Sequence, residues 1–247
     1  MCEIATHTDT IYAMSFNFDG SLLATSSKDK VLRVIDPRKG EVIQQGESHM
    51  GAKASRLVWC GSLNMIFTTG FSKMNERQYG VWNPVRPFGR CAVSLQFFFV
   101  IIFVSRSLSI RNPAFLSSFQ IHSSLLFLHP TDLSFQFLQA DLSKPMKMEM
   151  IDTSSGVLFP TYDEDTKLVF VAGKGDGNVR YFEMTTEPPY AHYLSEYKTS
   201  VPQRGVCFLP KRSLNVGECE IARMFKLTPK GQVEVVSFPV PRKVSAR

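Results

Sequence analysis

The sequence lacks the short motifs that mark several large classes of enzymes and metal proteins. Its 247 residues contain no G-x-x-x-x-G-K-S/T phosphate-binding loop and no G-x-S-x-G nucleophile elbow. Its five cysteines and five histidines show no metal-ligand spacing, and no pair of nucleophile and base stands out. We therefore expect a protein that is not an enzyme and has no catalytic, cofactor-binding or metal-binding residues.

Signals for export are also missing. The cysteines lie at positions 2, 60, 91, 207 and 219 without a C-x-x-C pair, and their odd number argues against a disulfide framework. The sequence has no N-x-S/T acceptor site, and its first ten residues have neither a basic region nor an apolar core. The most apolar run, residues 92–104, is shorter than the roughly 20 residues of a membrane-spanning helix. These features predict a cytoplasmic protein without a transmembrane segment.

One segment has almost no charge. Residues 89–139 contain no Lys and no Glu, but they hold nine Phe, nine Ser and eight Leu. This is nearly half of the 20 Phe in the chain, and no helical or strand period runs through the segment. We interpret it as an insertion between residues 1–88 and 140–247. It is either translated intron sequence, since pyrimidine-rich codons encode these residue types, or a disordered or lineage-specific loop.

The rest of the chain has an ordinary globular composition and a mild excess of positive charge. Hydrophobic residues make up 44%, charged residues 20%, and the net charge is +6. Some of the basic residues cluster along the chain. Such clusters are usually solvated loop faces, but they could also form a positively charged surface that binds an acidic partner. No nucleic-acid recognition motif accompanies them, so nucleic acid is not expected as a partner. The candidate partner-binding residues are Lys28, Lys30, Arg33, Arg38, Lys39, Lys211 and Arg212.

Short apolar stretches separated by Gly, Asp and Pro predict β-strands joined by turns. This pattern is typical of an all-β sandwich, barrel or propeller. The expected strands are residues 11–16, 22–26, 31–35, 57–59, 65–69, 79–82, 156–159, 168–172, 179–183, 205–209, 220–227 and 232–238.

A repeat favours the propeller. Three hydrophobic strands with a polar ending, VLRVID, RQYGVWN and GNVRYFE, end at positions 36, 83 and 183. The first interval is 47 residues, and the second is 100, of which 49 remain once the 51-residue insertion is removed. Both are slightly above the roughly 40–45 residues of a propeller blade. The repeat length and the composition therefore identify the same segment as inserted.

Within the first repeat, three polar residues have the spacing of a buried hydrogen-bond network. In a WD-repeat blade such a network joins a His, a Ser or Thr of the second strand and an Asp of the next turn. Here the members would be His7, Ser26 or Thr25, and Asp29. A catalytic role for the His and Asp is the less favoured alternative.

Two acidic or glycine-rich turns suggest ligand sites but lack the required spacing. The segment GKGDGN at 173–178 has no following helix, so we expect a turn between two strands. The segment DED at 163–165 lacks the glycine and the final glutamate of a calcium loop, so we expect a solvated turn.

The sequence outside the insertion resembles the coronin family of actin-binding WD-repeat proteins. The resemblance rests on long runs in the coronin order, and it covers about residues 7–88 and 140–243. The most specific runs are TTGFSKMNERQ, DTSSGVL, GKGDGNVRYFE and CEIARMFKL. It implies an all-β, partial WD-repeat β-propeller with about four of seven blades, interrupted by the insertion, and a C-terminal extension.

The resemblance also implies a function and partners. These are binding of actin filaments, regulation of the actin cytoskeleton, and partnership with the actin-related branching complex. The blades before residue 7 and a C-terminal coiled coil are expected to be missing. Two alternatives stay open, namely a propeller scaffold that binds another protein and a truncated product without autonomous function.

Overall fold

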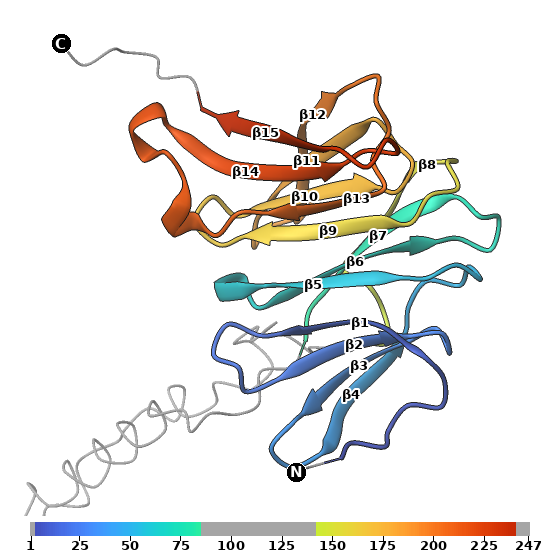
Figure 1. The fold of residues 1–247 in the computed structure, drawn as a ribbon. Coiled ribbons are helices and arrows are strands. Elements are labelled where there is room, and N and C mark those ends of the chain that lie inside the picture. The colour runs from blue at the N-terminus through green and yellow to red at the C-terminus, as the bar shows by residue number, and fades with distance from the viewer. Residues whose placement is uncertain (1–2, 85–141, 241–247) are drawn as a thin grey trace, which may run out of the picture. The chain divides into compact units, whose positions relative to one another are not determined.

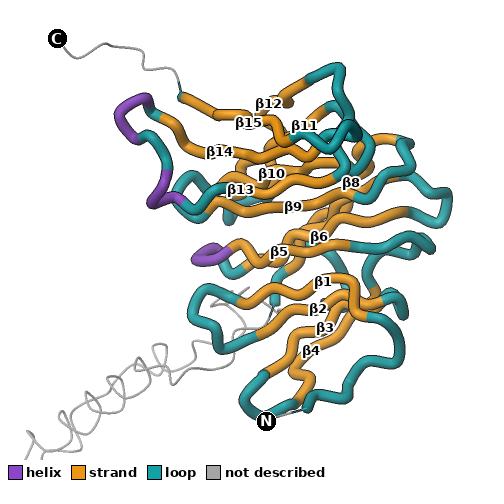
Figure 2. Tube along the Cα trace, viewed as in Figure 1, coloured by secondary structure: helices purple, strands orange, loops and turns teal. Residues whose placement is uncertain are grey.

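The structure, a computed structural model, describes residues 3–84 and 142–240, which form four antiparallel β-sheets (Figures 1 and 2). The four sheets belong to one unit of the chain, residues 1–84 and 140–247. Helix within the described residues is limited to three 3₁₀ turns, at Gly61–Leu63, Lys211–Ser213 and Val216–Glu218. The expected all-β fold is confirmed. The prediction about residues 89–139 lies outside the described residues.

Each sheet is built from strands that follow one another in the chain, and neighbouring strands pair antiparallel. Sheet 1 contains β1 (Ile11–Phe16), β2 (Leu23–Ser27), β3 (Val31–Asp36) and β4 (Glu41–Glu47). Sheet 2 contains β5 (Arg56–Cys60), β6 (Met65–Phe71), β7 (Arg77–Trp82) and β8 (Lys147–Asp152). Sheet 3 contains β9 (Leu158–Asp163), β10 (Leu168–Gly173), β11 (Asn178–Met184) and β12 (Ala191–Lys198). Sheet 4 contains, within the described residues, β13 (Gly205–Phe208), β14 (Glu220–Leu227) and β15 (Val233–Pro239).

The hydrophobic core consists of three clusters, one between each pair of successive sheets. Strand β6 contributes to two of them because side chains alternate between the faces of a strand. Ile66 packs with sheet 1, whereas Met65 and Phe67 pack with sheet 3. Every residue of β6 is therefore buried, including the two threonines that follow its apolar start Met65–Phe67. Strand β14 instead alternates buried and half-exposed residues.

The first strands of the sheets run parallel, so equivalent turns lie on the same side. Arg56 donates to the Tyr12 carbonyl (2.5 Å), and the Trp59 amide donates to Ser15 Oγ (3.0 Å), which aligns the start of β5 with that of β1. The remaining sheets are aligned in the same sense by contacts between Ser62 and Glu164, Thr69 and Leu158, Gln203 and Gly173, and Lys211 and Asp163.

Two faces follow from this alignment. We call the side at which each first strand begins the proximal face. Its turns are residues 28–30, 48–55, 72–76, 153–157, 174–177, 199–204 and 228–232. We call the side at which each first strand ends the distal face. Its described turns are residues 17–22, 37–40, 61–64, 164–167, 185–190 and 209–219.

Most expected strands are present, but the fourth strands of sheets 1 to 3 were not predicted. Strands β4, β8 and β12 are the outer edges of their sheets and bury few side chains, so their sequences carry little apolar signal. The predicted bounds of β9, residues 156–159, were too early, since the strand begins at Leu158 and runs to Asp163. The strand continues through Pro160, which is tolerated because β9 lies at a sheet edge.

Candidate functional site

A buried hydrogen-bond network joins strands β6 and β7 of sheet 2 to the loop that precedes β5. Trp82 of β7 donates its indole N–H to Thr68 Oγ1 of β6 (2.8 Å), and His49 Nε2 lies 2.9 Å from the same oxygen. Gln78 Nε2 lies 3.0 Å from His49 Nδ1. An amide nitrogen can only donate, so Nδ1 accepts and Nε2 carries the proton that it donates to Thr68. Burial lowers the pKa of His49 to about 4, which agrees with a neutral ring.

Sheet 1 contains a reduced version of this network. His7 Nε2 lies 2.8 Å from Thr25 Oγ1, so Thr25, and not Ser26, is the partner of His7. Ser26 faces the other way and donates to the Ser55 carbonyl. In sheet 2, Trp82 lies two residues after the partner of Thr68 on β7. In sheet 1, the residue two positions after the partner of Thr25 on β3 is Ile35. Sheet 1 therefore has no indole donor.

Asp29 lies in the second turn of sheet 1, and its hydrogen bonds join it to residues of that turn and to Thr8 rather than to His7. Its carboxylate accepts from Ser27 Oγ (2.5 Å), Thr8 Oγ1 (3.0 Å) and the Val31 amide (3.0 Å), and it pairs with Arg33 (2.7 Å). Burial alone would raise the pKa of Asp29, but Arg33 and these donors hold it well below its usual range. The role of Asp29 is to fix this turn.

Sequence reasoning missed His49, Thr68 and Trp82, although a signal was present. His7 and Thr25 are 18 residues apart, and His49 and Thr68 are 19 apart. A search one repeat later for a His and a Thr at nearly this spacing, followed by a Trp, would have identified the network.

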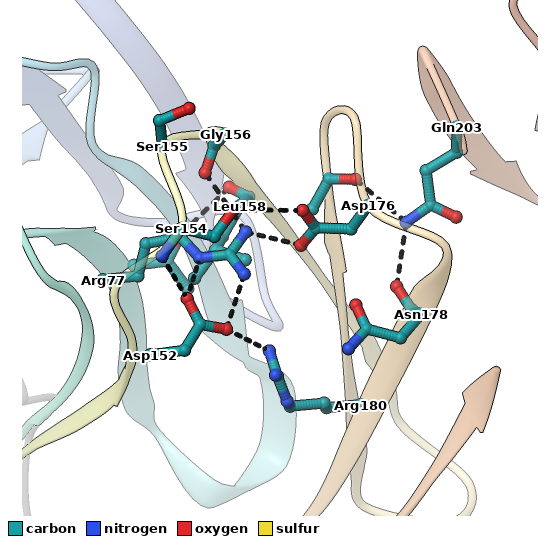
Figure 3. A network of polar contacts seen from close by, with 12 residues as sticks. Arg77, Asp152, Ser154, Ser155, Gly156, Leu158, Asp176, Asn178, Arg180 and Gln203 are labelled. Atoms are coloured by element: carbon teal, nitrogen blue, oxygen red, sulfur yellow. Dashed lines mark hydrogen bonds and ion pairs between the residues drawn. The ribbon is translucent and has the colours of Figure 1, made fainter. Parts of the chain in front are cut away.

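A second polar network ties sheets 2 and 3 together on the proximal face (Figure 3). Arg77 is 1% exposed and holds Asp152 through two hydrogen bonds, both 2.5 Å, and Asp176 through a third of 2.5 Å. Arg180 also pairs with Asp152 (2.8 Å). Burial opposes ionisation of Asp152, but Arg77 lowers its pKa below the ordinary value. The expected turn at residues 173–178 is confirmed, and its Asp176 belongs to this network.

Beside this network the surface forms a hollow of about 590 Å³. Each of its charged groups already has an ion-pair partner, with Lys198 held by Glu196, so the network serves to fix the two sheets. Within the described part of the chain, no three His, Cys, Asp or Glu side chains gather as metal ligands. No helix in those residues is long and apolar enough to cross a bilayer.

The predicted basic cluster at residues 28–39 is divided between the two faces. Lys28 and Lys30 are exposed on the proximal face. Arg33 is 6% exposed and engaged by Asp29, so it is not accessible to a partner. Arg38 and Lys39 are exposed on the distal face, in the turn after β3.

The second predicted cluster lies on the distal face. Lys211 donates to the Ile221 carbonyl (2.5 Å) and pairs with Asp163 (2.6 Å), so it connects sheet 4 to sheet 3. Arg212 is exposed. The turn at 163–165 is therefore not simply solvated, since Glu164 also accepts from the Ser62 amide of sheet 2 (3.1 Å).

Comparison with known proteins gives a consistent result. Residues 1–36 match the family described as WD domain, G-beta repeat. Coronin-2B of Xenopus tropicalis is 40% identical over 240 residues, which cover 96% of this chain and 38% of that protein. Coronin-A of Dictyostelium discoideum is 36% identical over 237 residues, covering 96% of this chain and 40% of that protein. The crystal structure of the WD40 domain from Toxoplasma gondii coronin aligns with a TM-score of 0.69 at 27% identity, over 96% of this chain and 47% of that one.

The chain is a partial member of the coronin family. Its four sheets are WD-repeat blades of a β-propeller, as the sequence runs indicated. It spans about two fifths of the length of the curated coronins that it matches, such as 38% of Coronin-2B. The activities and partners of whole coronins are therefore proposals for this chain.

Proposed function

We propose that this chain binds actin filaments through exposed basic side chains of its propeller blades and thereby helps to organise the actin cytoskeleton. The observation that carries the proposal is its match to coronins over 96% of its length. The proposal assigns the chain a binding role without catalysis.

The accessible charges narrow the predicted set of contacts. Two of its members, Arg33 and Lys211, are occupied by Asp29 and Asp163. Two alternative contact sets remain exposed, namely Lys28 and Lys30 on the proximal face, and Arg38, Lys39 and Arg212 on the distal face.

Co-sedimentation with actin filaments tests the proposal. Contacts between exposed charges are screened over a Debye length of about 10 Å at 0.1 M salt, and over a shorter distance at higher salt. We expect the chain to pellet with filaments at about 0.1 M salt and much less at about 0.3 M. Salt-independent pelleting, or no pelleting by a sample that unfolds cooperatively, would refute the proposal.

Two further parts of the proposal need their own measurements. Association with the actin-related branching complex predicts that the purified complex captures the chain. A place in the cytoplasmic actin cytoskeleton predicts that the tagged chain overlaps with stained filaments in cells, and diffuse staining would contradict it.

A further inference from the structure

The turns between the second and third strands of the four sheets share a feature. Each is closed by a backbone hydrogen bond from its fourth residue to its first, and each contains lysine. In sheets 1, 2 and 3 the lysine is the second residue of the turn, namely Lys28, Lys73 and Lys174. In sheet 4 that position is Pro229, and Lys230 follows it. Lys30 adds a second lysine to the turn of sheet 1.

These lysines are exposed, and their charges are largely unpaired. Lys30, Lys73, Lys174 and Lys230 make no ion pair within the residues that the structure describes, and Lys28 pairs only with the partly exposed Asp9 (3.4 Å). An exposed pair of this kind holds its lysine weakly.

Most acidic groups near these turns are paired with arginine or lysine side chains, whereas Glu47 and Glu76 have no ion pair within the described residues. Asp29 pairs with Arg33, and Arg77 holds the carboxylates of sheets 2 and 3. Glu196 pairs with Lys198 (2.6 Å). Positive charge therefore dominates this part of the proximal face.

The parallel first strands place all four turns on the proximal face. The distal face differs, because one of its cations pairs across the sheets and two others share their turn with a carboxylate. Lys211 contacts Asp163, and the backbone amides of Arg38 and Lys39 lie 2.9 and 3.3 Å from Asp36 Oδ1.

We propose that these five turn lysines form one docking surface that meets the acidic surface of an actin filament. The proposal rests on the proposed function and assigns it to the proximal face. We call this set the lysine array. Its members are Lys28, Lys30, Lys73, Lys174 and Lys230.

The repeat explains how a chain of modest net charge, +6, could bind an acidic surface. A single exposed ion pair contributes little. Several cations on one face add up, and because the turns are closed by backbone hydrogen bonds, binding has to order only the lysine side chains. The array therefore acts through the number of its lysines and their position on one face.

Two variants with the same loss of charge test the array. The first, K73Q/K174Q/K230Q, removes three array lysines that have no ion pair. The matched control, R38Q/K39Q/R212Q, removes three exposed cations of the distal face. Each changes the net charge from +6 to +3, and exposed substitutions of this kind should leave thermal unfolding almost unchanged.

We expect the array variant to bind actin filaments about tenfold more weakly than the wild-type chain at about 0.1 M salt. The control should stay within about twofold, and K73R/K174R/K230R should bind like the wild type. If the triple Gln variant unfolds, each single Gln variant should lose about two- to threefold.

Other outcomes overturn the proposal in distinguishable ways. Equal losses in both triple variants would mean that net charge, and not this face, controls binding. If the wild-type chain pellets with filaments and the array variant pellets equally well, the array is refuted but the proposed function stands. A folded wild-type chain that does not pellet with actin filaments would refute both the array and the proposed function. Pelleting with vesicles of anionic lipid instead would not rescue either.

Discussion

Thr68→Val is expected to destabilise the fold because one hydroxyl serves three buried groups. Thr68 Oγ1 accepts from Trp82 and from His49, and it donates to the Gly80 carbonyl (3.3 Å). Valine has almost the same shape as threonine, so packing is kept while two buried N–H donors lose their acceptor. Each orphaned group costs about 1–3 kcal/mol. We expect a loss of about 3 kcal/mol in the free energy of unfolding.

Thr25→Val is the matched control, at the equivalent position of sheet 1. Among the described side chains only His7 bonds to this hydroxyl, and His7 is half-buried. Water can replace part of the lost interaction, so we expect a loss of about 1 kcal/mol or less. Thr68→Ser keeps the hydroxyl and should recover most of the stability that Thr68→Val loses.

Urea unfolding followed by tryptophan fluorescence measures these changes. The chain has two tryptophans, and both lie in the buried cluster between sheets 1 and 2, so the signal reports on this region. Equal losses in Thr68→Val and Thr25→Val would refute the reasoning. A loss below about 1 kcal/mol for Thr68→Val would refute it as well.

Two further predictions concern buried charge. Because burial lowers the pKa of His49 to about 4 from 6.5, the unfolded chain binds a proton at this ring between these pH values and the folded chain does not. Stability should fall as the pH drops through this range, by up to about 3 kcal/mol, and identical urea midpoints at pH 7 and 4.5 would contradict this. Arg77→Met leaves Asp152 and Asp176 without their shared cation and should cost about 3–5 kcal/mol. Lys198→Met, at a side chain 71% exposed, should cost less than about 1 kcal/mol, and similar unfolding free energies for the two variants would speak against the network.

The inner strands of the sheets were predicted because they carry buried side chains. Strands β6 and β10 are buried along their whole length, and their apolar runs make them visible. The outer strands β4, β8 and β12 are held by backbone pairing to one neighbour, and most of their side chains meet water. Backbone pairing leaves little trace in composition, so these strands were missed.

The candidate contacts were harder to predict because proximity in sequence differs from proximity on a face. Lys30 and Arg38 are close in the chain, but β3 lies between them. Six residues of strand separate their turns by roughly 20 Å. Lys73, Lys174 and Lys230 are far apart in sequence, yet equivalent turns place them on one face. The repeat, once aligned, contains this information, whereas a search for charge runs does not.

Contact between actin filaments and the proximal face of this coronin chain can be measured directly. Lysine footprinting by acetylation and mass spectrometry tests it on the unaltered chain, with and without filaments. We expect filaments to protect Lys73, Lys174 and Lys230 from acetylation and to leave Lys39 of the distal face as reactive as before. Protection of Lys39, with the three array lysines unprotected, would contradict contact through the proximal face.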